Sequence, residues 1–356
     1  MKTYAPKKAN VDKLQRFVSN ALQKVGVAKP DADLTATMLV GADLRGIESH
    51  GMMNLCEYLR GLRTGAINPH PTVKVSAGSP TTVSVDGDRG LGFIVGYRAM
   101  TECLRMAQEY GTGWATACNS THSGAGAYYV LMAAERDMIG MHWSTGGSTV
   151  AAPGGKRRLI GNNVMAFAAP GRRHGPFVLD MAPTMAIANK LHMLQWAGKP
   201  MPEGWAVDQQ GIPVTDPNRY FAEPGAILPL GSTAANGVHK GFGLLLIIDI
   251  LSGLLSGDGG SMLRKKGEHS HAFCALRIDA FPTGGALKDL MDEMIEKLHA
   301  TPTVEGIDRV RYPGERGNAV AQERRANGIP LQQHVVDEIR GAAKELSLSF
   351  EDVWQE

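Results

Sequence analysis

The sequence predicts an α/β fold in which a helical N-terminal region precedes a longer region of alternating strands and helices. Three observations support this prediction. Apolar residues recur at helical spacing through the first 70 residues. Near residue 72 the pattern changes to alternating apolar and polar residues, which is typical of strands. From residue 114 onward, short apolar segments alternate with helical ones, as they do in α/β proteins.

The N-terminal region is expected to contain three helices. In the first, Val11, Leu14, Val18, Ala21 and Val25 form one apolar face, and the helix ends near Gly26. A second helix is expected to begin after Pro30, and a third to cover 52–63.

The middle of the chain supplies the predicted strands. Segments 72–76 and 82–85 read as a hairpin around the turn at 78–80, and a helix is expected over 90–110. The elements expected next are strand 114–118, helix 127–136, strand 139–144, a glycine-rich loop at 146–155, strands 164–169 and 177–181, and a helix that begins near Pro183.

The last third is expected to hold one long loop, one buried helix and further regular elements. Segment 200–229 is rich in proline and glycine and reads as a long ordered loop. Segment 241–256 is nearly all apolar, but it is short for a membrane span and contains Asp249, so we expect a helix buried on all sides. A strand at 272–279 and helices at 285–299 and 331–346 follow.

Composition excludes several classes of function. With 37 basic and 35 acidic residues, the chain gives no electrostatic reason to expect nucleic-acid binding. The four cysteines are scattered, which predicts reduced thiols without a disulfide framework or a zinc site. The first residues lack the apolar core of a signal peptide. We therefore expect a cytoplasmic protein without a membrane segment.

The first candidate site is the stretch 119–126, with His122 at its centre. It follows a predicted strand and precedes a predicted helix, and ligands bind at such strand ends in open α/β sheets. An acid/base residue would be useful there, although a single histidine at a strand end is more often structural. The spacing of its glycines is not that of a Rossmann loop.

The second candidate is the corner between the second and third helices. Arg45 could hold a carboxylate with two hydrogen bonds, His50 could act as acid or base, and Ser49 could donate to a substrate oxygen. In the competing interpretation, Ser49 caps a helix and Arg45 pairs with Glu48.

Asp180, at the end of the 177–181 strand, is the third candidate. Its carboxylate could orient a catalytic histidine and stabilise its charged form. The alternative is that Asp180 caps the helix expected near Pro183.

Two further segments offer positive charge for a phosphate. In 231–243, glycines precede Lys240 at the start of an apolar helix, which suits pyrophosphate or, alternatively, only close packing. Arg172 and Arg173 could meet a ribose 2′-phosphate or could simply be solvated. His269 and His271 lack a third metal ligand at suitable spacing, so no metal site is expected.

Taken in order, these segments resemble the type-2 malate/L-lactate dehydrogenase family, which includes sulfolactate and ureidoglycolate dehydrogenases, 2,3-diketo-gulonate reductase and Δ1-piperideine-2-carboxylate reductases. The resemblance covers nearly the whole chain. It is carried by ADLRGIESHG (42–51), VDGDRGLG (85–92), NSTHSGAGAYY (119–129), APGG (152–155), AFAAP (166–170), VLDMAP (178–183), PEGWAVDQQGIPVTDP (202–217), PLGS (229–232), HKGFGLLLIIDILSGLLSG (239–257) and PGE…GIPL (313–331).

The resemblance implies an architecture and a cofactor. The fold would be a three-layer α/β/α arrangement with a mixed, non-Rossmann, seven-stranded sheet, and a helical domain built from both termini. Its regions would be 1–71 packing with 285–356, then 72–120 with 258–284 on the substrate side, and 121–257 for NAD(P). The cofactor would be NADH or NADPH; the arginines at 172 and 173 favour NADPH slightly. The resemblance also implies a homodimer.

By position, the resemblance also assigns roles to residues. The catalytic group would comprise His50, His122 and Asp180. The substrate would contact Arg45, Ser49, Thr145 and Gly146. The cofactor would contact His122, Asn162, Asp180, Met181, Lys240, Gly241, Arg172 and Arg173.

The resemblance implies an oxidoreductase that moves a hydride between nicotinamide and C2 of a small 2-oxo or 2-hydroxy carboxylic acid. A reductase of cyclic imino acids, such as Δ1-piperideine-2-carboxylate or pyrroline-2-carboxylate, is the alternative, and a nucleotide-binding member without catalysis is a third. The chain departs from the family pattern at 146–149, at 162–165 and at Pro183. Because these departures surround the expected pocket, the substrate stays open.

Overall fold

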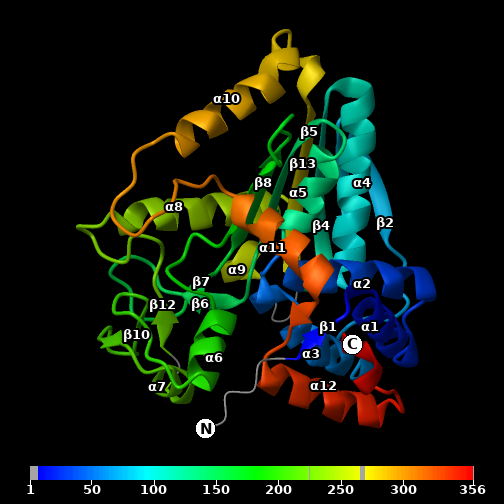
Figure 1. Cartoon of the computed structure of the whole chain (residues 1–356), viewed down its shortest axis with the longest axis vertical. Helices are drawn as coiled ribbons and strands as arrows, with labels where there is room; N and C mark the ends of the chain where they lie inside the picture. The colour runs from blue at the N-terminus through cyan, green and yellow to red at the C-terminus, as the bar shows by residue number, and fades with distance from the viewer. Residues whose placement is uncertain (1–6, 224, 265–268, 356) are drawn as a thin grey trace.

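A seven-stranded mixed sheet forms the middle of the molecule (Figure 1). The computed structural model describes residues 7–223, 225–264 and 269–355. The strands run in the spatial order β2 (Lys74–Ser79), β3 (Thr82–Asp86), β4 (Thr112–Ser120), β13 (His269–Arg277), β5 (Met138–Ser144), β8 (Val164–Ala169) and β9 (Phe177–Met181). Only β3 and β4 pair in parallel, and the other neighbours are antiparallel. The predicted mixed sheet is confirmed.

Helices cover both faces of this sheet. Helix α4 (Gly92–Tyr110) packs on β4 and β13, and α5 (Ala127–Ala134) packs beside it on β5 and β8. Successive side chains of a strand point to opposite faces. Accordingly, Phe273 and Ala275 join the core under α4, while Ala272 and Cys274 join a second core with Ile248. The result is the predicted three-layer arrangement.

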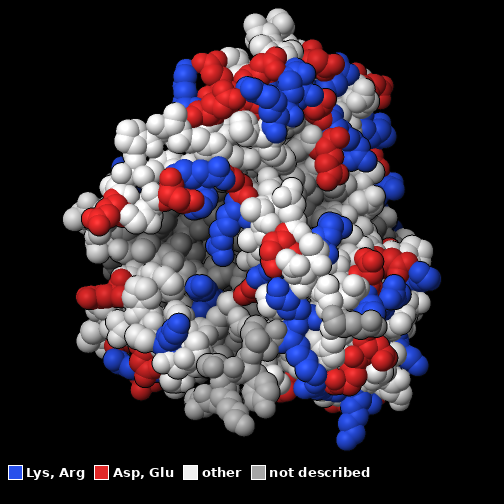
Figure 2. All heavy atoms as spheres, viewed as in Figure 1, with Lys and Arg blue, Asp and Glu red and all other residues white. Residues whose placement is uncertain are grey.

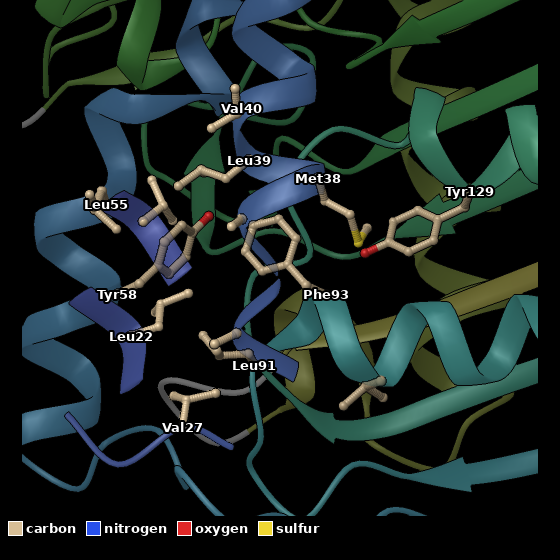
Figure 3. Packing of buried hydrophobic residues seen from close by; sticks show 14 of the residues in the cluster. Leu22, Val27, Met38, Leu39, Val40, Leu55, Tyr58, Leu91, Phe93 and Tyr129 are labelled. Carbon is tan, nitrogen blue, oxygen red and sulfur yellow. The ribbon is translucent and has the colours of Figure 1, made fainter. Parts of the chain in front are cut away.

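The largest core joins the α4 face of the sheet to a helical region. Helices α1 (Val11–Lys24), α2 (Lys29–Leu44) and α3 (Leu55–Arg63) supply much of it, and Figure 3 shows Leu22, Leu39 and Leu55 packing toward Tyr58 and Phe93. Burying each such side chain contributes about 1.5–3 kcal/mol. The third helix is shorter than expected, because 52–54 form a 3₁₀ turn.

The end of the chain returns to these N-terminal helices. Helix α11 (Glu315–Asn327) contacts α2, α12 (Gln333–Glu345) contacts α3, and β1 (Lys8–Ala9) pairs with β14 (Ile329–Pro330). The sequence patterns did not predict α11. Helix α10 (Leu287–His299) lies away from this helical region in Figure 1. The strands of the seven-stranded sheet come from segments on both sides of residues 120 and 257, where predicted regions meet. The predicted limits of these regions therefore stay a prediction.

The interpretation of 200–229 as a long loop was wrong. This segment contains two paired strands, a short helix and a third strand. Its strands join one strand from the predicted glycine-rich loop at 146–155 and one that follows this loop, in a second, five-stranded sheet. Its elements are β6 (Ser148–Val150), β7 (Ile160–Gly161), β10 (Ala206–Val207), β11 (Pro213–Val214), α7 (Pro217–Ala222) and β12 (Ala226–Ile227). Strands this short carry too few alternating residues to be recognised from sequence.

Two helix predictions also need correction. No helix begins near Pro183: Thr184 forms an isolated bridge with Pro229, and α6 covers Ala188–Trp196. Helix α8 (Val238–Ile248) continues as a π-helix over Asp249–Leu254, and it is not buried on all sides. Ile247, Ile250 and Leu254 are about half exposed, because they point away from the sheet.

The surface carries charges of both signs. Figure 2 shows lysine and arginine interspersed with aspartate and glutamate on the viewed face. Within the described residues, none of the helices has the length and apolar character needed to cross a membrane.

Candidate active site

Three histidines from separate parts of the chain meet at one cavity. His50 belongs to the corner after α2, His122 to the turn after β4, and His269 is the first residue of β13. Between ring centroids, His122 lies 5.5 Å from His50 and 6.0 Å from His269. All three line a cavity of ≈ 530 Å³, a volume within the usual range for small-molecule sites. The structure thus brings together the two histidines that the sequence singled out and adds a third.

The turn that carries His122 is fixed by the start of α4. The Thr121 hydroxyl accepts a hydrogen bond from the Gly92 N–H at 3.0 Å and donates to the Gly90 carbonyl at 3.1 Å. Gly124 has a φ of +71° and packs against the Phe93 ring, so a side chain there would be strained. These contacts hold His122 at the C-terminal end of β4, as the sequence predicted.

Burial controls the charge state of the histidine cluster. It lowers the pKa of His122 well below its usual value, and the neighbouring His50 and His269 lower it further. Burial and the charge of Arg264 lower the pKa of His269 to about 4. The rings are therefore neutral near pH 7, and a bound anion would raise their proton affinity.

His50 shares its surroundings with Asp180 and Arg45. Burial lowers the pKa of His50, while the charge of Asp180 opposes that shift. Burial raises the pKa of Asp180, and His50 and Arg45 oppose it. The Ser49 hydroxyl lies 2.9 Å from His50 Nδ1. Asp180 can therefore support a positive charge on His50 electrostatically.

The two competing interpretations of these residues were wrong. Glu48 pairs with Arg324 at 2.6 Å instead of Arg45. The Asp180 carboxylate accepts the Ala127 N–H at 2.8 Å, so it caps the start of α5 and no helix near Pro183. The Nε atom of Arg45 is buried without a partner among the described residues, and Arg45 lies outside the cavity lining.

Thr145, Gly146 and Asn162 also line the cavity, and the Thr145 carbonyl lies 2.9 Å from His269 Nδ1. The Gly146 N–H donates to Asn163 Oδ1 at 3.0 Å. Arg264 donates to the Thr145 hydroxyl at 2.8 Å and to the Gly146 carbonyl at 2.6 Å. A Cβ at position 146 would collide with Asn162, so the two departures from the family pattern at these positions fit one another.

The cavity residues that were not predicted as site residues include Asn54, Tyr58, Thr149 and His269. Asn54 and Tyr58 are four residues apart next to His50, so helical spacing could have placed both on its side of the helix. His269 had been considered only as a metal ligand. Thr149 lies in a short strand with no sequence signal.

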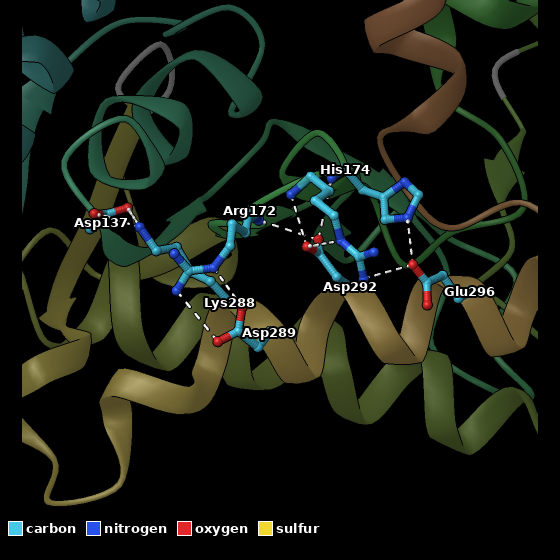
Figure 4. A network of polar contacts seen from close by, with 8 residues as sticks. Asp137, Arg172, His174, Lys288, Asp289, Asp292 and Glu296 are labelled. Atoms are coloured by element: carbon cyan, nitrogen blue, oxygen red, sulfur yellow. Dashed lines mark hydrogen bonds and ion pairs between the residues drawn. The ribbon is translucent and has the colours of Figure 1, made fainter.

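Several predicted cofactor residues lie outside the cavity lining. Arg172 pairs with Asp289, and Arg173 pairs with Asp292 at 3.2 Å and with Glu296 at 2.7 Å (Figure 4). Lys240 is exposed near the start of α8, and Gly241 packs closely on the backbone of Leu230. Met181 ends β9 beside Asp180. Their roles toward a cofactor stay predictions.

The cavity has room and unused polar atoms for a nicotinamide group. Thr149 Oγ1 is buried and has no hydrogen-bond partner among the described residues, yet Thr149 lines the cavity. A buried hydroxyl without a partner costs about 1–3 kcal/mol, which a bound polar group would relieve. A Cβ at Gly147 would meet nothing within 4 Å. The residues present therefore fit such a group.

No metal-binding cluster was found where the structure is described: three His, Cys, Asp or Glu side chains do not gather there as ligands would. His271 instead bonds to Ser144 Oγ at 2.8 Å and to Ser120 Oγ at 3.1 Å.

Comparison with known proteins gives one consistent family. The family model described as malate/L-lactate dehydrogenase matches residues 9–340. A malate dehydrogenase of Pyrococcus horikoshii is 39% identical over 95% of both chains. An L-sulfolactate dehydrogenase of Methanocaldococcus jannaschii is 32% identical over 95% of this chain and 97% of its own.

Two other relatives carry a cofactor in their names. A (2R)-3-sulfolactate dehydrogenase (NADP(+)) of Chromohalobacter salexigens is 33% identical over 91% of this chain and 94% of its own. A ureidoglycolate dehydrogenase (NAD(+)) of Escherichia coli is 28% identical over 93% of both.

The fold is shared with solved structures. The malate dehydrogenase structure from Pyrococcus horikoshii superimposes with a TM-score of 0.88 at 36% identity, covering 98% of this chain and 99% of that one. The sulfolactate dehydrogenase structure from Methanocaldococcus jannaschii gives 0.86 at 31% identity, covering 97% and 99%.

Proposed function

The chain belongs to the malate/L-lactate dehydrogenase family, and we propose that it is an NAD(P)-dependent oxidoreductase acting at C2 of a small 2-oxo or 2-hydroxy carboxylic acid. The observation that carries this proposal is the meeting of His50, His122 and His269 at one cavity. A carbonyl that becomes an alcohol needs a proton at its oxygen, and histidine is the usual donor near neutral pH.

The chain's own residues would handle the proton and the charge. When bound, the nicotinamide cofactor would supply or accept the hydride at C2. In the reductive direction, His122 gives the proton to the substrate oxygen, and it takes the proton back in the oxidative direction. His50 lies beside His122, with Asp180 close enough to favour its charged form. Proton transfer of this kind is typically worth about 10²–10⁴-fold in rate.

The substrate carboxylate needs a cationic or hydrogen-bonding partner. Arg45 is the residue predicted from the sequence, but it lies outside the cavity lining. Asn54 and Arg60 line the cavity, and Arg60 carries a fixed positive charge. Thr145 and Gly146, which also line the cavity, would contact the substrate beside them. A partly charged wall of this kind favours a small acid over a neutral carbonyl compound.

The experiment that tests the proposal is a panel of acids assayed with both cofactors, followed by the absorbance of reduced nicotinamide. The panel contains pyruvate, oxaloacetate, sulfopyruvate and Δ1-piperideine-2-carboxylate. Turnover of a 2-oxo acid supports the proposal. Turnover of only the cyclic imine would assign the chain to imino-acid reduction, and no turnover with any compound would reject catalysis at this site.

We also propose that the chain works as a homodimer. Support comes from the apolar face formed by Ile247, Ile250, Leu254, Leu255, Met262 and Leu263, all at least 44% exposed. Faces of this kind are typical of protein–protein contacts. The same segment touches the active-site wall, since Gly253 packs close to Thr145. Light scattering of the purified protein tests this, and a monomer at assay concentration would reject it.

A further inference from the structure

Tyr58 reaches the candidate acid/base residue from a separate element. Its hydroxyl oxygen lies 2.6 Å from His122 Nδ1, and the two rings are inclined by 17° with centroids 6.1 Å apart. Tyr58 is 4% exposed and packs edge-on against Phe93, as Figure 3 shows. Helix α3 holds it there through Leu55, Leu59 and Leu62, which are buried in the main core. The hydroxyl is therefore held firmly against one nitrogen of the ring.

The contact leaves the other ring nitrogen for the cavity. No described residue makes a hydrogen bond to His122 Nε2. The imidazole ring carries its two nitrogens on different edges, and the partner of one nitrogen determines how the other is used. A tyrosine hydroxyl can both donate and accept. It can therefore keep Nδ1 engaged in either charge state of the ring.

We propose, as a refinement that rests on the proposed function, that Tyr58 is a positioning residue for His122. By holding Nδ1, it makes Nε2 the atom that exchanges a proton with the substrate oxygen. In reduction, C2 gains the hydride pair, the carbonyl π pair moves onto oxygen, and that oxygen takes the proton from Nε2 of charged His122. The ring then keeps one proton, at Nδ1, facing the Tyr58 oxygen. Oxidation runs through the same atoms in reverse.

This assignment separates the roles of the two candidate histidines. His50 Nδ1 is in hydrogen-bond contact with the hydroxyl of Ser49, the preceding residue, and His50 lies near the charge of Asp180. Among the described residues, the ionisable neighbours that lower the pKa of His122 are His50 and His269, and neither is a carboxylate. Its ring is therefore oriented by a neutral hydroxyl, whose own charged form is suppressed because burial raises the pKa of Tyr58.

The contact also tunes the proton affinity of His122. A hydrogen bond from a charged N–H to oxygen is stronger than one between neutral groups, so Tyr58 stabilises the charged ring more than the neutral one. Other titratable or charged groups also face the Tyr58–His122 pair. The corner after α2 contributes His50 and Arg45, with Asp180 of β9 beside them. Helix α3 contributes Glu57 and Arg60, and β13 with the segment before it contributes His269, His271, Arg264 and Asp258.

The test is Tyr58→Phe, which keeps the ring and removes the oxygen. We expect kcat to fall about 10- to 100-fold, because a misaligned donor loses most of its advantage. KM should change less than about twofold, since the substitution keeps the Tyr58 ring in the cavity lining and removes only the hydroxyl that contacts His122. The pKa of His122 should fall by about half a unit to one unit, which corresponds to losing one charge-assisted contact.

Nuclear magnetic resonance of ¹⁵N-labelled histidine in the cofactor-free protein reads this pKa and the tautomer without any turnover. We expect one dominant tautomer in the wild type and a mixture in the variant. Tyr312→Phe is the matched control: Tyr312 is also buried, its hydroxyl donates to the Gly175 carbonyl at 3.1 Å, and the histidine ring beside it is that of His299, at 6.1 Å, outside the cavity. It should change neither readout.

Each result has a defined meaning. Unchanged kcat and an unchanged His122 pKa in Tyr58→Phe would overturn the proposal, as would equal shifts in Tyr312→Phe. If the wild type turns over no acid, the proposed function fails, yet the magnetic resonance measurement still decides whether Tyr58 controls the His122 ring. A fall in kcat without a tautomer or pKa change would also overturn it, since a loss of general rigidity would then suffice.

Discussion

Two clusters of ionisable side chains in this protein are stabilised in different ways. The buried histidine cluster comprises His50, His122, His142, His269 and His271, and its rings are held mostly by hydroxyl and carbonyl oxygens. The Asp292 network comprises Arg172, Arg173, His174, Asp289, Asp292 and Glu296, in which opposite charges pair directly (Figure 4).

The pKa is lowered in both clusters, but by different causes and with a different resulting charge. Burial lowers the pKa of His142 and His269 to about 4, so the cluster stays neutral. Burial would raise the pKa of Asp292, but backbone N–H groups of Arg173, His174 and Arg172 outweigh it and hold the value at about 2. The charges of the Asp292 network are thus already paired, whereas the neutral histidines can take up a proton when an anion binds. Only groups that can gain and lose a proton in this way suit acid/base catalysis.

The largest effect should come from His122→Ala. If the histidine cluster is the catalytic half of this contrast, kcat should fall about 10²–10⁴-fold, because the substrate oxygen loses its proton donor. Cofactor binding and the thermal midpoint should change little. Steady-state kinetics with a 2-oxo acid, cofactor titration and a melting curve measure the three quantities. Activity within a few-fold of wild type would remove His122 from the mechanism.

A second effect concerns stability in acid. Because the folded pKa of His142 is about 4 and lies below its ordinary value of 6.5, its neutral form stabilises the fold above pH 6.5. That contribution is lost as the pH falls from 6.5 toward 4, by about 2–3 kcal/mol for one such group. In His142→Phe, which can keep the stacking on Phe273, the free energy of unfolding should fall less steeply over this range.

Urea denaturation at pH 7 and at pH 4.5 measures the slope of that second effect. His334→Gln is the control, because His334 is 45% exposed and lies at the surface, where it pairs with Glu338 and its ring lies against Trp196. The control should keep the wild-type slope. A His142→Phe protein with the same slope as wild type would mean that other histidines of the cluster carry the acid sensitivity.

The third effect tests the Asp292 network. Asp292→Asn removes the charge that accepts three backbone N–H groups, and it should cost about 2 kcal/mol at pH 7. The direction is the same as for His142, because a depressed folded pKa means that stabilisation is lost as the pH falls; for Asp292 the loss occurs at lower pH. The folded pKa is depressed to about 2, so the stabilisation is present above the ordinary value of 3.8 and fades as pH falls from 3.8 toward 2.

The difference in melting temperature between wild type and Asp292→Asn should therefore be smaller at pH 3 than at pH 7. The turnover of folded protein should be within about twofold of wild type, because the network makes no contact with the cavity lining among the described residues. A variant that loses turnover while staying folded would place the network in the site after all.

The sequence predicted the sheet well because its strands are long and apolar. Strands β8 and β9 have the predicted limits, and β4 and β5 differ only at their ends. The small sheet escaped prediction because its strands have two or three residues, too few for any periodicity. Helix α11 escaped because it is polar nearly all round and none of its residues is buried.

The candidate site divides in the same way. His50 and His122 were found because each lies in a recognisable local segment, at a helix corner and at a strand end. Tyr58 and His269 were missed because their importance comes from contacts across 64 residues for Tyr58 and from sheet pairing for His269. Local pattern does not encode such contacts. The arginines at 172 and 173 could be seen as cations, but their acidic partners on α10 could not.

The smallest effect on stability is expected from Arg172→Ala. Arg172 is about half exposed and pairs with exposed Asp289, so its loss should change the free energy of unfolding by less than about 1 kcal/mol. If Arg172 nevertheless meets a ribose 2′-phosphate, the KM for NADPH should rise about tenfold while the KM for NADH stays unchanged, since only NADPH carries that phosphate. Arg98→Ala, which removes another half-exposed arginine, here paired with Glu102, should alter neither KM. An equal KM for NADPH in Arg172→Ala and wild type would leave the whole Asp292 network structural, and the choice between cofactors would then rest with residues nearer the cavity.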